Sequence, residues 1–246
     1  MKSISIAAPV FNEELNINSC IDTWVNILDE LEIEDYEIIL CDDKSTDNSV
    51  NIIESCIVKN PRIKLFKHNI NKGAAKAVIS AGNESTKDRI LFVDSDGQFP
   101  KSSIKKIIEA SNKKPNHCIF GARRVKEDSF LTQFGTKLTT ILFNGIYGKS
   151  LGDISCILKV FPQSIYKKLS LESTGLNVST EMSCRALELN CDIIEQSVDH
   201  RAREFGTSSA AGVRFIKHGL KRIIFLKYYF LRRILIIFGI ISPSQD

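Results

Sequence analysis

Two aspartates, one residue apart, end an apolar run in the stretch LFVDSDGQFP at residues 91–100. Where a strand ends the chain can turn, so the carboxylates of Asp94 and Asp96 can reach one ion instead of facing opposite sides. Two close carboxylates raise each other's pKa, and a divalent cation removes this repulsion. Carboxylate oxygens favour Mg²⁺ or Mn²⁺ over zinc, and Mg²⁺ is typically held by one or two carboxylates plus substrate phosphates. The spacing therefore predicts a metal and nucleoside diphosphate site, with a capping pair on a surface turn as the alternative.

A second acidic pair and a helix start carry related chemistry. Asp42 and Asp43 follow the apolar run IILC. One of them can cap the next helix, and the other can accept hydrogen bonds from a base imide or from ribose hydroxyls. The stretch NKGAA at residues 71–75 places Lys72 at an expected helix N-terminus, which suits a phosphate. The alternative for Lys72 is a solvated side chain at an ordinary helix start.

Strand and helix patterns alternate along the first 120 residues. Apolar runs predict strands at residues 3–8, 36–41, 62–66, 89–93 and 117–120, with helices between them, one of which is expected to run from the cap at residues 45–47 to residue 59. This alternation predicts an α/β fold with a doubly wound, mostly parallel sheet and helices on both faces. Ligands bind beyond the carboxyl ends of the strands in such sheets. Residues 9–13, 42–43 and 94–98 all follow strands, so we expect them to converge on one rim.

The second half of the chain is expected to complete the same sheet. Its patterns predict a helix at residues 130–147, a strand at 154–161, a helix at 178–189 and a strand at 192–198. We therefore expect one domain at residues 1–210, made of a donor half (residues 1–125) that binds a nucleotide sugar and an acceptor half (residues 126–210). Residues 211–246 are expected to form a basic and apolar helical tail.

Several segments together resemble a known family. APVFNEE, LCDDKSTDNS, NKGAAKA, FVDSDGQFP and GARR, in this order, resemble glycosyltransferase family 2 with its GT-A fold. Residues 153–161, 180–182 and 200–208 resemble the D-x-x-[CS]-G-x-[KR]-x-[FY] segment, the glutamate helix and the R-x-x-G-x-S-K segment of its polyprenyl-phosphate (dolichol-phosphate) sugar synthase branch. Two positions depart from that branch: Ile157 stands where its pattern has glycine, and Ser209 where it has lysine.

The resemblance implies roles for individual residues. The nucleoside and sugar would lie among Pro9, Phe11, Glu13, Cys41 and Asp43, with Lys72, Asp94, Ser95 and Gln98 completing the nucleotide-sugar site. Asp94, Asp96 and Gln98 would hold Mg²⁺ or Mn²⁺ and the diphosphate. Arg123 and Arg203 would bind phosphate at the reacting end. Candidate acceptor-phosphate ligands are Arg123, Arg124, Lys137, Arg201 and Arg203, and their alternative is a solvated basic rim.

The acceptor decides which catalytic groups the reaction needs. Family 2 implies inversion by single displacement, and a sugar hydroxyl acceptor then needs a general base, for which Asp153 and Glu181 are the candidates. Their alternative roles are a turn cap and a helix-face charge. A phosphate monoester has a second pKa of about 6, so it is already an anionic nucleophile that needs cations to place it. The basic candidates outnumber the acidic ones, which favours a phosphate acceptor.

The leading prediction is a metal-dependent inverting glycosyltransferase that moves a hexose from a UDP- or GDP-sugar to polyprenyl phosphate. Transfer to a glycan hydroxyl in surface polysaccharide assembly is the alternative within the same class. A nucleotidyltransferase ranks below both, because APVFNEE contains no glycine-rich phosphate loop, and a non-catalytic nucleotide-binding module is the remaining alternative.

The C-terminal segment has its own charge pattern. Residues 214–233 contain seven Lys and Arg and no acid. On a helix, Arg214, Lys217, Lys221, Arg222, Arg232 and Arg233 fall within one arc, opposite an apolar face. Basic residues within the apolar stretch 223–241 would each cost about 2.5–3.5 kcal/mol at the centre of a bilayer. The pattern therefore predicts an amphipathic helix lying in the plane of an anionic membrane, with a packing helix, an oligomer contact or a membrane-protein partner as alternatives.

The remaining sequence features restrict the possible binding partners and the cellular compartment. A net charge of +4 is too small to predict nucleic-acid binding. Seven cysteines, an odd number without CxxC spacing, indicate reduced thiols in the cytosol, so we expect a peripheral protein on the cytoplasmic face of the membrane. The N-terminus has too short an apolar stretch for a secretory signal. His68, His117, His200 and Lys159 have no partner that the sequence identifies, and we interpret them as structural.

Overall fold

A computed structural model describes residues 3–124, 130–148, 150–174, 177–203 and 213–243 of the protein. A seven-stranded sheet crosses the molecule in the order β3-β2-β1-β4-β6-β5-β7. Its strands are β1 (Ser3–Val10), β2 (Asp35–Asp42), β3 (Ile63–Lys67), β4 (Arg89–Phe92), β5 (Cys118–Arg123), β6 (Lys159–Pro162) and β7 (Ile193–Val198). Strand β6 runs antiparallel to β4 and β5, and every other pair is parallel. The predicted doubly wound, mostly parallel sheet is confirmed.

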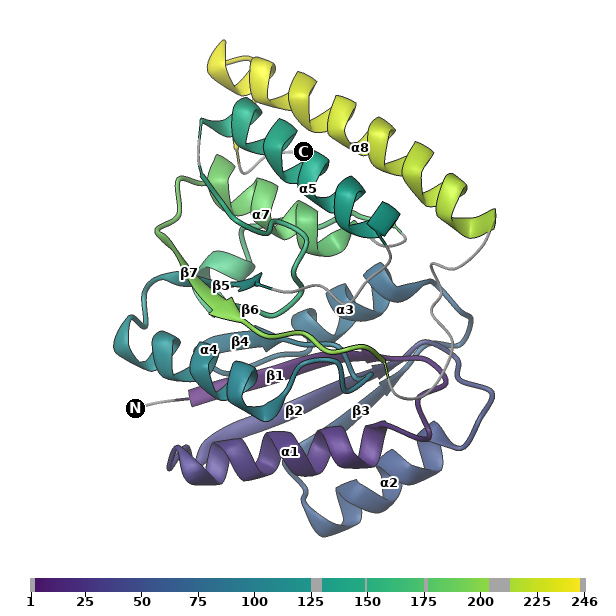
Figure 1. The fold of residues 1–246 in the computed structure, drawn as a ribbon. Coiled ribbons are helices and arrows are strands. Elements are labelled where there is room, and N and C mark those ends of the chain that lie inside the picture. The colour runs from purple at the N-terminus through teal and green to yellow at the C-terminus, as the bar shows by residue number, and fades with distance from the viewer. Residues whose placement is uncertain (1–2, 125–129, 149, 175–176, 204–212, 244–246) are drawn as a thin grey trace.

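Helices cover both faces of this sheet (Figure 1). They are α1 (Ile17–Glu30), α2 (Ser49–Lys59), α3 (Ala74–Asn83), α4 (Lys101–Lys113), α5 (Phe130–Tyr147), α6 (Gln163–Tyr166), α7 (Val178–Glu188) and α8 (Val213–Ile237). Helices α1, α2 and α4 lie on one face, and α3 and α7 lie on the other. Helices α5 and α8 lie against each other as an outer layer beyond α7.

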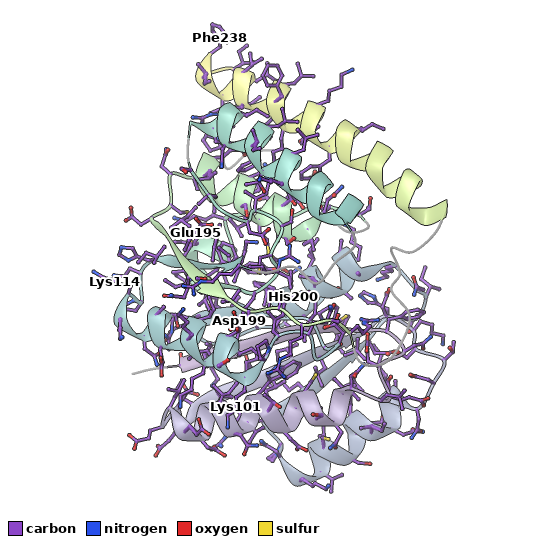
Figure 2. The ribbon with its side chains drawn as sticks, viewed as in Figure 1. Lys101, Lys114, Glu195, Asp199, His200 and Phe238 are labelled. Carbon is purple, nitrogen blue, oxygen red and sulfur yellow. The ribbon has the colours of Figure 1, made fainter. Side chains whose placement is uncertain are left out.

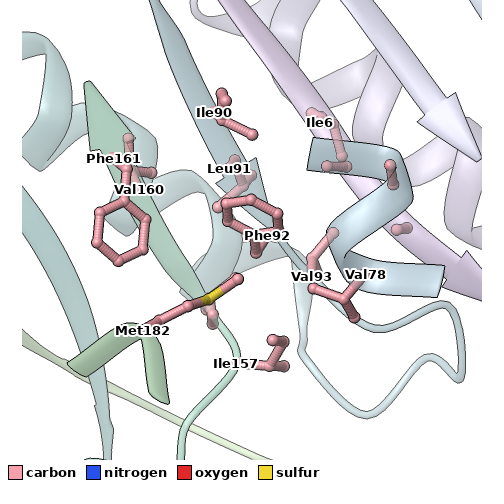
Figure 3. Close-up of a cluster of buried hydrophobic side chains, with 14 of the residues drawn as sticks. Ile6, Val78, Ile90, Leu91, Phe92, Val93, Ile157, Val160, Phe161 and Met182 are labelled. Carbon is pink, nitrogen blue, oxygen red and sulfur yellow. The ribbon is translucent and has the colours of Figure 1, made fainter. Parts of the chain in front are cut away.

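Strand β4 and its buried neighbours connect the two halves of the molecule (Figure 3). Ile90, Leu91 and Phe92 are fully buried, and the ring of Phe92 lies 6.2 Å from the ring of Phe161 on β6. Because β4 leads directly into Asp94, this packing fixes the position at which the two aspartates of the DSD segment begin. Burial of large apolar side chains of this kind contributes about 1.5–3 kcal/mol each, so the end of β4 is a rigid platform.

Two predicted elements begin at different residues in the structure. The strand predicted at residues 154–161 was wrong in its first part, because β6 begins at Lys159. The Lys159 ammonium donates to the carbonyl oxygens of Ile154 and Cys156, so this stretch turns back on itself. The helix predicted from residue 45 begins only at Ser49. There Asp42 accepts hydrogen bonds from the backbone N–H groups of Lys44 and Ser45, which hold a loop before the helix.

Helix α8 turns the side chain of Arg232 toward the protein. Arg232 is only 4% exposed, and its Nε donates to Glu188 at 3.0 Å. Ile224, Leu231 and Ile237 are exposed instead. The predicted outward arc of basic residues is therefore wrong for Arg232, because a buried carboxylate of α7 pairs with it. Arg214, Lys217, Lys221 and Arg222 lie outside the described side chains. No helix in the described ranges combines the length and apolar character that crossing a membrane requires.

Candidate active site

The loops after β1 and β4 meet the segment after β7 at one buried ion-pair cluster. Arg203 donates from Nη2 to Glu13 at 2.9 Å and to Asp96 at 3.0 Å. The carboxylates of Glu13 and Asp96 are both buried. Glu13 and Asp96, which are distant in sequence from each other and from Arg203, thus share the guanidinium of Arg203. The expected convergence of the β1 and β4 loops on one rim is present, and Arg203 joins them from the second half.

Asp94 lies next to this cluster and carries a strongly shifted pKa. Burial, together with the neighbouring Asp96 carboxylate, raises the pKa of Asp94 to about 7, although Arg123 and Arg203 oppose the rise. Burial also raises the pKa of Glu13. The chain turns directly after Asp96 at Gly97, whose φ of 75° is in the region that favours glycine, and the backbone N–H of Gln98 donates to the Asp96 carboxylate. The site therefore gathers more negative charge than its arginines offset.

This charge excess and the oxygen ligands fit a divalent cation. Asp94 and Asp96 are the residues that would hold Mg²⁺ or Mn²⁺, because hard cations prefer carboxylate oxygens. Within the described ranges no cluster of three or more His, Cys, Asp or Glu side chains is arranged for a metal, so substrate phosphate oxygens would complete such a coordination shell. Gln98, the third predicted ligand, donates from its side-chain amide to the carbonyl oxygen of Arg201 at 2.9 Å. That bond fixes Gln98 against the segment that carries Arg203.

Asp43 connects three segments of the rim. Its carboxylate accepts hydrogen bonds from the backbone N–H groups of Lys72 at 2.8 Å and Gly73 at 2.7 Å. The Nδ1 atom of His68 lies 2.7 Å from the same carboxylate. Asp43 therefore holds the loop that precedes α3. His68, which we interpreted as structural, is a direct partner of this predicted nucleotide-binding residue.

Of the other residues predicted to bind the nucleotide sugar, some lie on the rim of the sheet and others lie in the protein interior. Ser95 donates from its hydroxyl to the carbonyl oxygen of Pro9 at 2.7 Å, which joins the ends of β1 and β4. Phe11 is 47% exposed, and Lys72 is also exposed. Cys41 is fully buried, with its thiol 3.6 Å from His68. The Cys41 side chain thus faces the interior, and only its backbone remains available toward a nucleoside.

Arg123 and Asp153 form a two-contact ion pair between the halves. Arg123 donates from Nε at 2.7 Å and from Nη2 at 3.3 Å to the two carboxylate oxygens of Asp153. Asp153 is almost fully buried and also accepts from the backbone N–H of Ser155. This geometry fixes the orientation of Arg123. Asp153, predicted as a candidate base, is placed to position an arginine.

Glu181 is also occupied by protein contacts. Its buried carboxylate accepts hydrogen bonds from the backbone N–H groups of Glu172 at 3.0 Å and Ser173 at 2.8 Å. The hydroxyl of Tyr229 on α8 donates to it at 3.1 Å. Glu181 therefore joins α7, the loop before it and α8.

A cavity of about 160 Å³ opens between Asp94 and Arg123. Its wall comes from both halves and consists of Pro9, Ala74, Val78, Asp94, Phe99, Arg123, Ser155, Ile157, Val178, Ser179 and His200. Figure 2 shows His200 beside Asp199 near the middle of the molecule, just beyond β7. Sequence reasoning missed Ser155, Ser179 and His200 as site residues. His200 follows the carboxyl end of a parallel strand, and this signal could have identified it.

Two predicted acceptor-phosphate residues lie farther out. Lys137 is exposed on α5 in the outer helical layer. Arg201 is exposed, and its backbone N–H donates to the carbonyl oxygen of Gln98 at 2.9 Å. The resembled segment continues into residues 204–208, which, like Ser209, lie outside the described residues. The structure thus brings Arg123 and Arg203 to the aspartates and leaves Lys137 in a separate layer.

Comparison with known proteins decides the family. The sequence pattern of Glycosyl transferase family 2 matches residues 5–174, which is more than half of the chain. The chain belongs to glycosyltransferase family 2. The predicted family and the predicted enzyme class, a glycosyltransferase, are confirmed.

The glycosyltransferase is similar to a curated relative that acts on a polyprenyl phosphate. It is 25% identical over 221 residues to undecaprenyl-phosphate 4-deoxy-4-formamido-L-arabinose transferase of Proteus mirabilis (strain HI4320). The match covers 88% of this chain and spans 65% of the relative's length. The predicted resemblance to the polyprenyl-phosphate branch is confirmed by this similarity.

Solved structures share the fold of the glycosyltransferase. Glucosyl-3-phosphoglycerate synthase of Mycobacterium tuberculosis, in complex with Mn²⁺, UDP and phosphoglyceric acid, matches with a TM-score of 0.70 at 16% identity, covering 94% of this chain and 78% of that chain. Its complex with Mg²⁺ and UDP matches with a TM-score of 0.68 at 15% identity, covering 92% and 79%. These likenesses confirm the predicted GT-A fold.

Proposed function

We propose that this glycosyltransferase moves a hexose from a UDP- or GDP-sugar to a polyprenyl phosphate, with inversion and with Mg²⁺ or Mn²⁺ as cofactor. The observation that carries the acceptor assignment is the state of the two candidate bases. Asp153 and Glu181 are both buried, and the donors that contact them engage both oxygens of each carboxylate. A hydroxyl acceptor would need such a base with an available lone pair near the reacting centre. A phosphate acceptor would not.

The donor would lie across the rim with its diphosphate at Asp94 and Asp96. When bound, the cation would offset charge that develops on the leaving nucleoside diphosphate. Arg203 already contacts Asp96 and Glu13, so its guanidinium is within reach of the same diphosphate. The structures of similar fold contain UDP together with Mn²⁺ or Mg²⁺, which supports UDP as the first nucleotide to test.

The acceptor phosphate would lie on the other side of the cavity, at Arg123. Arg123 lines the cavity, and Asp153 holds its guanidinium in one orientation, which suits a cationic group that places an anion. The polyprenyl phosphate of the Proteus relative supports a lipid phosphate at this position. In this arrangement the acceptor oxygen attacks the anomeric carbon in the cavity between Asp94 and Arg123, opposite the leaving diphosphate.

A lipid acceptor requires the protein to work at a membrane surface. Exposed apolar side chains lie on both outer helices, at Leu138, Ile141 and Leu142 on α5 and at Ile224, Leu231 and Ile237 on α8. Basic residues of the segment 214–233 other than Arg232, which is buried against Glu188, would add attraction to anionic lipids. We therefore propose peripheral association with the cytoplasmic face of the membrane through this layer. Flotation with anionic and neutral vesicles tests it, and absence from both vesicle fractions would contradict it.

Product analysis tests the acceptor assignment. The purified chain is given radiolabelled UDP-glucose or GDP-mannose with Mn²⁺ and either undecaprenyl phosphate or undecaprenol, which lacks the phosphate. We expect label in the lipid extract only with undecaprenyl phosphate, and we expect this label to disappear when a chelator removes the metal. Label transferred to undecaprenol or to a glycan, with none on the lipid phosphate, would overturn the proposal.

A further inference from the structure

The cavity between Asp94 and Arg123 has apolar lining residues that the proposed chemistry does not use. They include Val78, Phe99, Ile157 and Val178, and the polar lining residues are Asp94, Arg123, Ser155, Ser179 and His200. Whole ligand pockets usually measure about 300–1,000 Å³. A cavity of about 160 Å³ is much smaller, so it fits one ring rather than a complete nucleotide sugar. Its position beside Asp94 makes the transferred sugar the fitting occupant.

Ile157 is the member of this wall that distinguishes the chain. The polyprenyl-phosphate sugar synthase segment that residues 153–161 resemble has glycine at this position, and glycine would leave open the space that the Ile157 side chain fills. Ile157 is 8% exposed and belongs to the same buried cluster as Val78 and Met182, with which Figure 3 draws it. The side chain therefore separates the packed core from the cavity.

The wall at Ile157 is rigid for two reasons. The neighbouring backbone is fixed, because Lys159 donates to the carbonyl oxygens of Ile154 and Cys156 on the same turn. The side chain is β-branched, and such side chains have little freedom about their first torsion angle. A ring substituent that points at Ile157 can thus be accommodated only by displacing packed core atoms.

We propose that Ile157 is a specificity-determining residue that restricts the transferred sugar to a compact ring without an N-acetyl or similarly bulky substituent. The inference deepens the proposed function and rests on it, with UDP as the nucleotide. One methylene group more or less in an apolar pocket changes discrimination by about 10–200-fold. A steric block by a whole isoleucine side chain is expected to discriminate by at least about tenfold.

Calorimetry with three ligands tests this restriction. Binding of UDP, UDP-glucose and UDP-N-acetylglucosamine is measured in Mn²⁺ for the wild type, Ile157→Gly, Ile157→Ala and the control Ile70→Gly, which alters an exposed isoleucine outside the cavity. In the wild type and the control we expect UDP-N-acetylglucosamine to bind at least about tenfold more weakly than UDP-glucose. In both Ile157 variants this ratio is expected to fall to about threefold or less.

The possible outcomes test the role of Ile157 and the proposed function separately. A ratio near one in the wild type, or an unchanged ratio in variants that unfold cooperatively, would overturn the role of Ile157 while leaving the donor site in place. Failure of the wild type to bind UDP at all would overturn the uridine form of the proposed function itself. If Ile157→Gly does not fold, the Ala variant and a milder Ile157→Val variant decide, because their ratios are expected to follow side-chain volume.

Discussion

Two clusters of carboxylates, one in each half of the molecule, are neutralised in different ways. In the donor half, Glu13 and Asp96 share the guanidinium of Arg203, and burial together with Asp96 raises the pKa of Asp94 to about 7. In the acceptor half, Asp153 pairs with Arg123, and Glu188 pairs with Arg232 and accepts from the hydroxyl of Tyr147. Asp153 and Glu188 thus accept from donors on both oxygens, as Asp43 does in the donor half, whereas Glu13, Asp94 and Asp96 crowd around Arg203.

This difference distinguishes carboxylates that can bind a ligand from carboxylates that hold other protein groups in place. A buried carboxylate whose oxygens are all engaged stabilises the groups that it contacts and is poorly placed to take a proton. A crowded set of carboxylates favours whatever brings positive charge, including a divalent cation. The comparison supports the proposal that Asp94 and Asp96 bind the cation and diphosphate, while Asp153 and Glu181 position Arg123 and the outer helix α8.

The largest expected effect comes from removing charge in the donor half. Asp96→Asn eliminates one of the two carboxylates that would hold the cation and also weakens the contact with Arg203. We expect transfer to fall by more than about a hundredfold, the scale on which lost transition-state stabilisation acts. Initial rates with saturating donor and Mn²⁺ measure this loss. Asp22→Asn, an exposed carboxylate on α1, serves as the control and is expected to keep its rate.

A smaller effect is expected in the acceptor half at Asp153. Asp153→Asn removes the charge that orients Arg123, and misplacement of a positioning group lowers rates by about ten- to a hundredfold. Because Asp153 does not take the proton in this account, the shape of the pH–rate profile is expected to stay the same. Loss of the acidic limb of the profile, on which the rate rises as a general base deprotonates, would instead identify Asp153 as the base.

The pH dependence of metal binding tests the crowding at Asp94. The pKa of Asp94 is raised to about 7, so below that pH the folded protein keeps a proton there that cation binding must displace. Mn²⁺ affinity in the presence of UDP is therefore expected to rise as pH increases and to fall by about tenfold from pH 8 to pH 6. Calorimetry in buffers of different ionisation enthalpy counts the released proton. Equal affinity at pH 6 and pH 8 would contradict the shifted pKa.

The smallest effect on catalysis is expected at Glu181. Glu181→Gln weakens hydrogen bonds to the loop before α7 and to Tyr229, and we expect the free energy of unfolding to fall by about 1–3 kcal/mol. Tyr229→Phe removes only one of these bonds and is expected to lower it by about 0.5–1.5 kcal/mol. Chemical denaturation measures both values. Rates well below the melting transition are expected to stay near wild type, so an inactive but stable Glu181→Gln variant would restore Glu181 as a base.

The sequence allowed the rim of the sheet to be predicted, because parallel strands end at one edge and polar residues follow those ends. Asp43, Asp94 and Asp96 were found in this way. Contacts across long separations had no such signal: Arg203 reaches Glu13 across 190 positions. The reversal at residues 154–158 depends on the buried Lys159 ammonium, which periodicity cannot reveal.

The orientation of helix α8 also depends on a contact that the sequence pattern does not reveal. A helical projection places Arg232 on a basic face, but it contains no information about Glu188 of α7, which draws the guanidinium inward. The pairing partner of a charge decides which side of a helix faces the protein, and that partner lies 44 residues away. The outward direction of Ile224 and Leu231 follows from this pairing and was not predicted.

Nucleotide binding with and without metal tests the central claim that the crowded acids of the donor half form a cation and diphosphate site. UDP and GDP are titrated by calorimetry into the wild type and Asp96→Asn, with and without Mn²⁺. We expect one of the two nucleotides to bind the wild type with Mn²⁺, and to bind at least about tenfold more weakly without the metal or in the variant. Absence of binding by either nucleotide in either condition, or binding that neither Mn²⁺ nor Asp96→Asn changes, would contradict the claim.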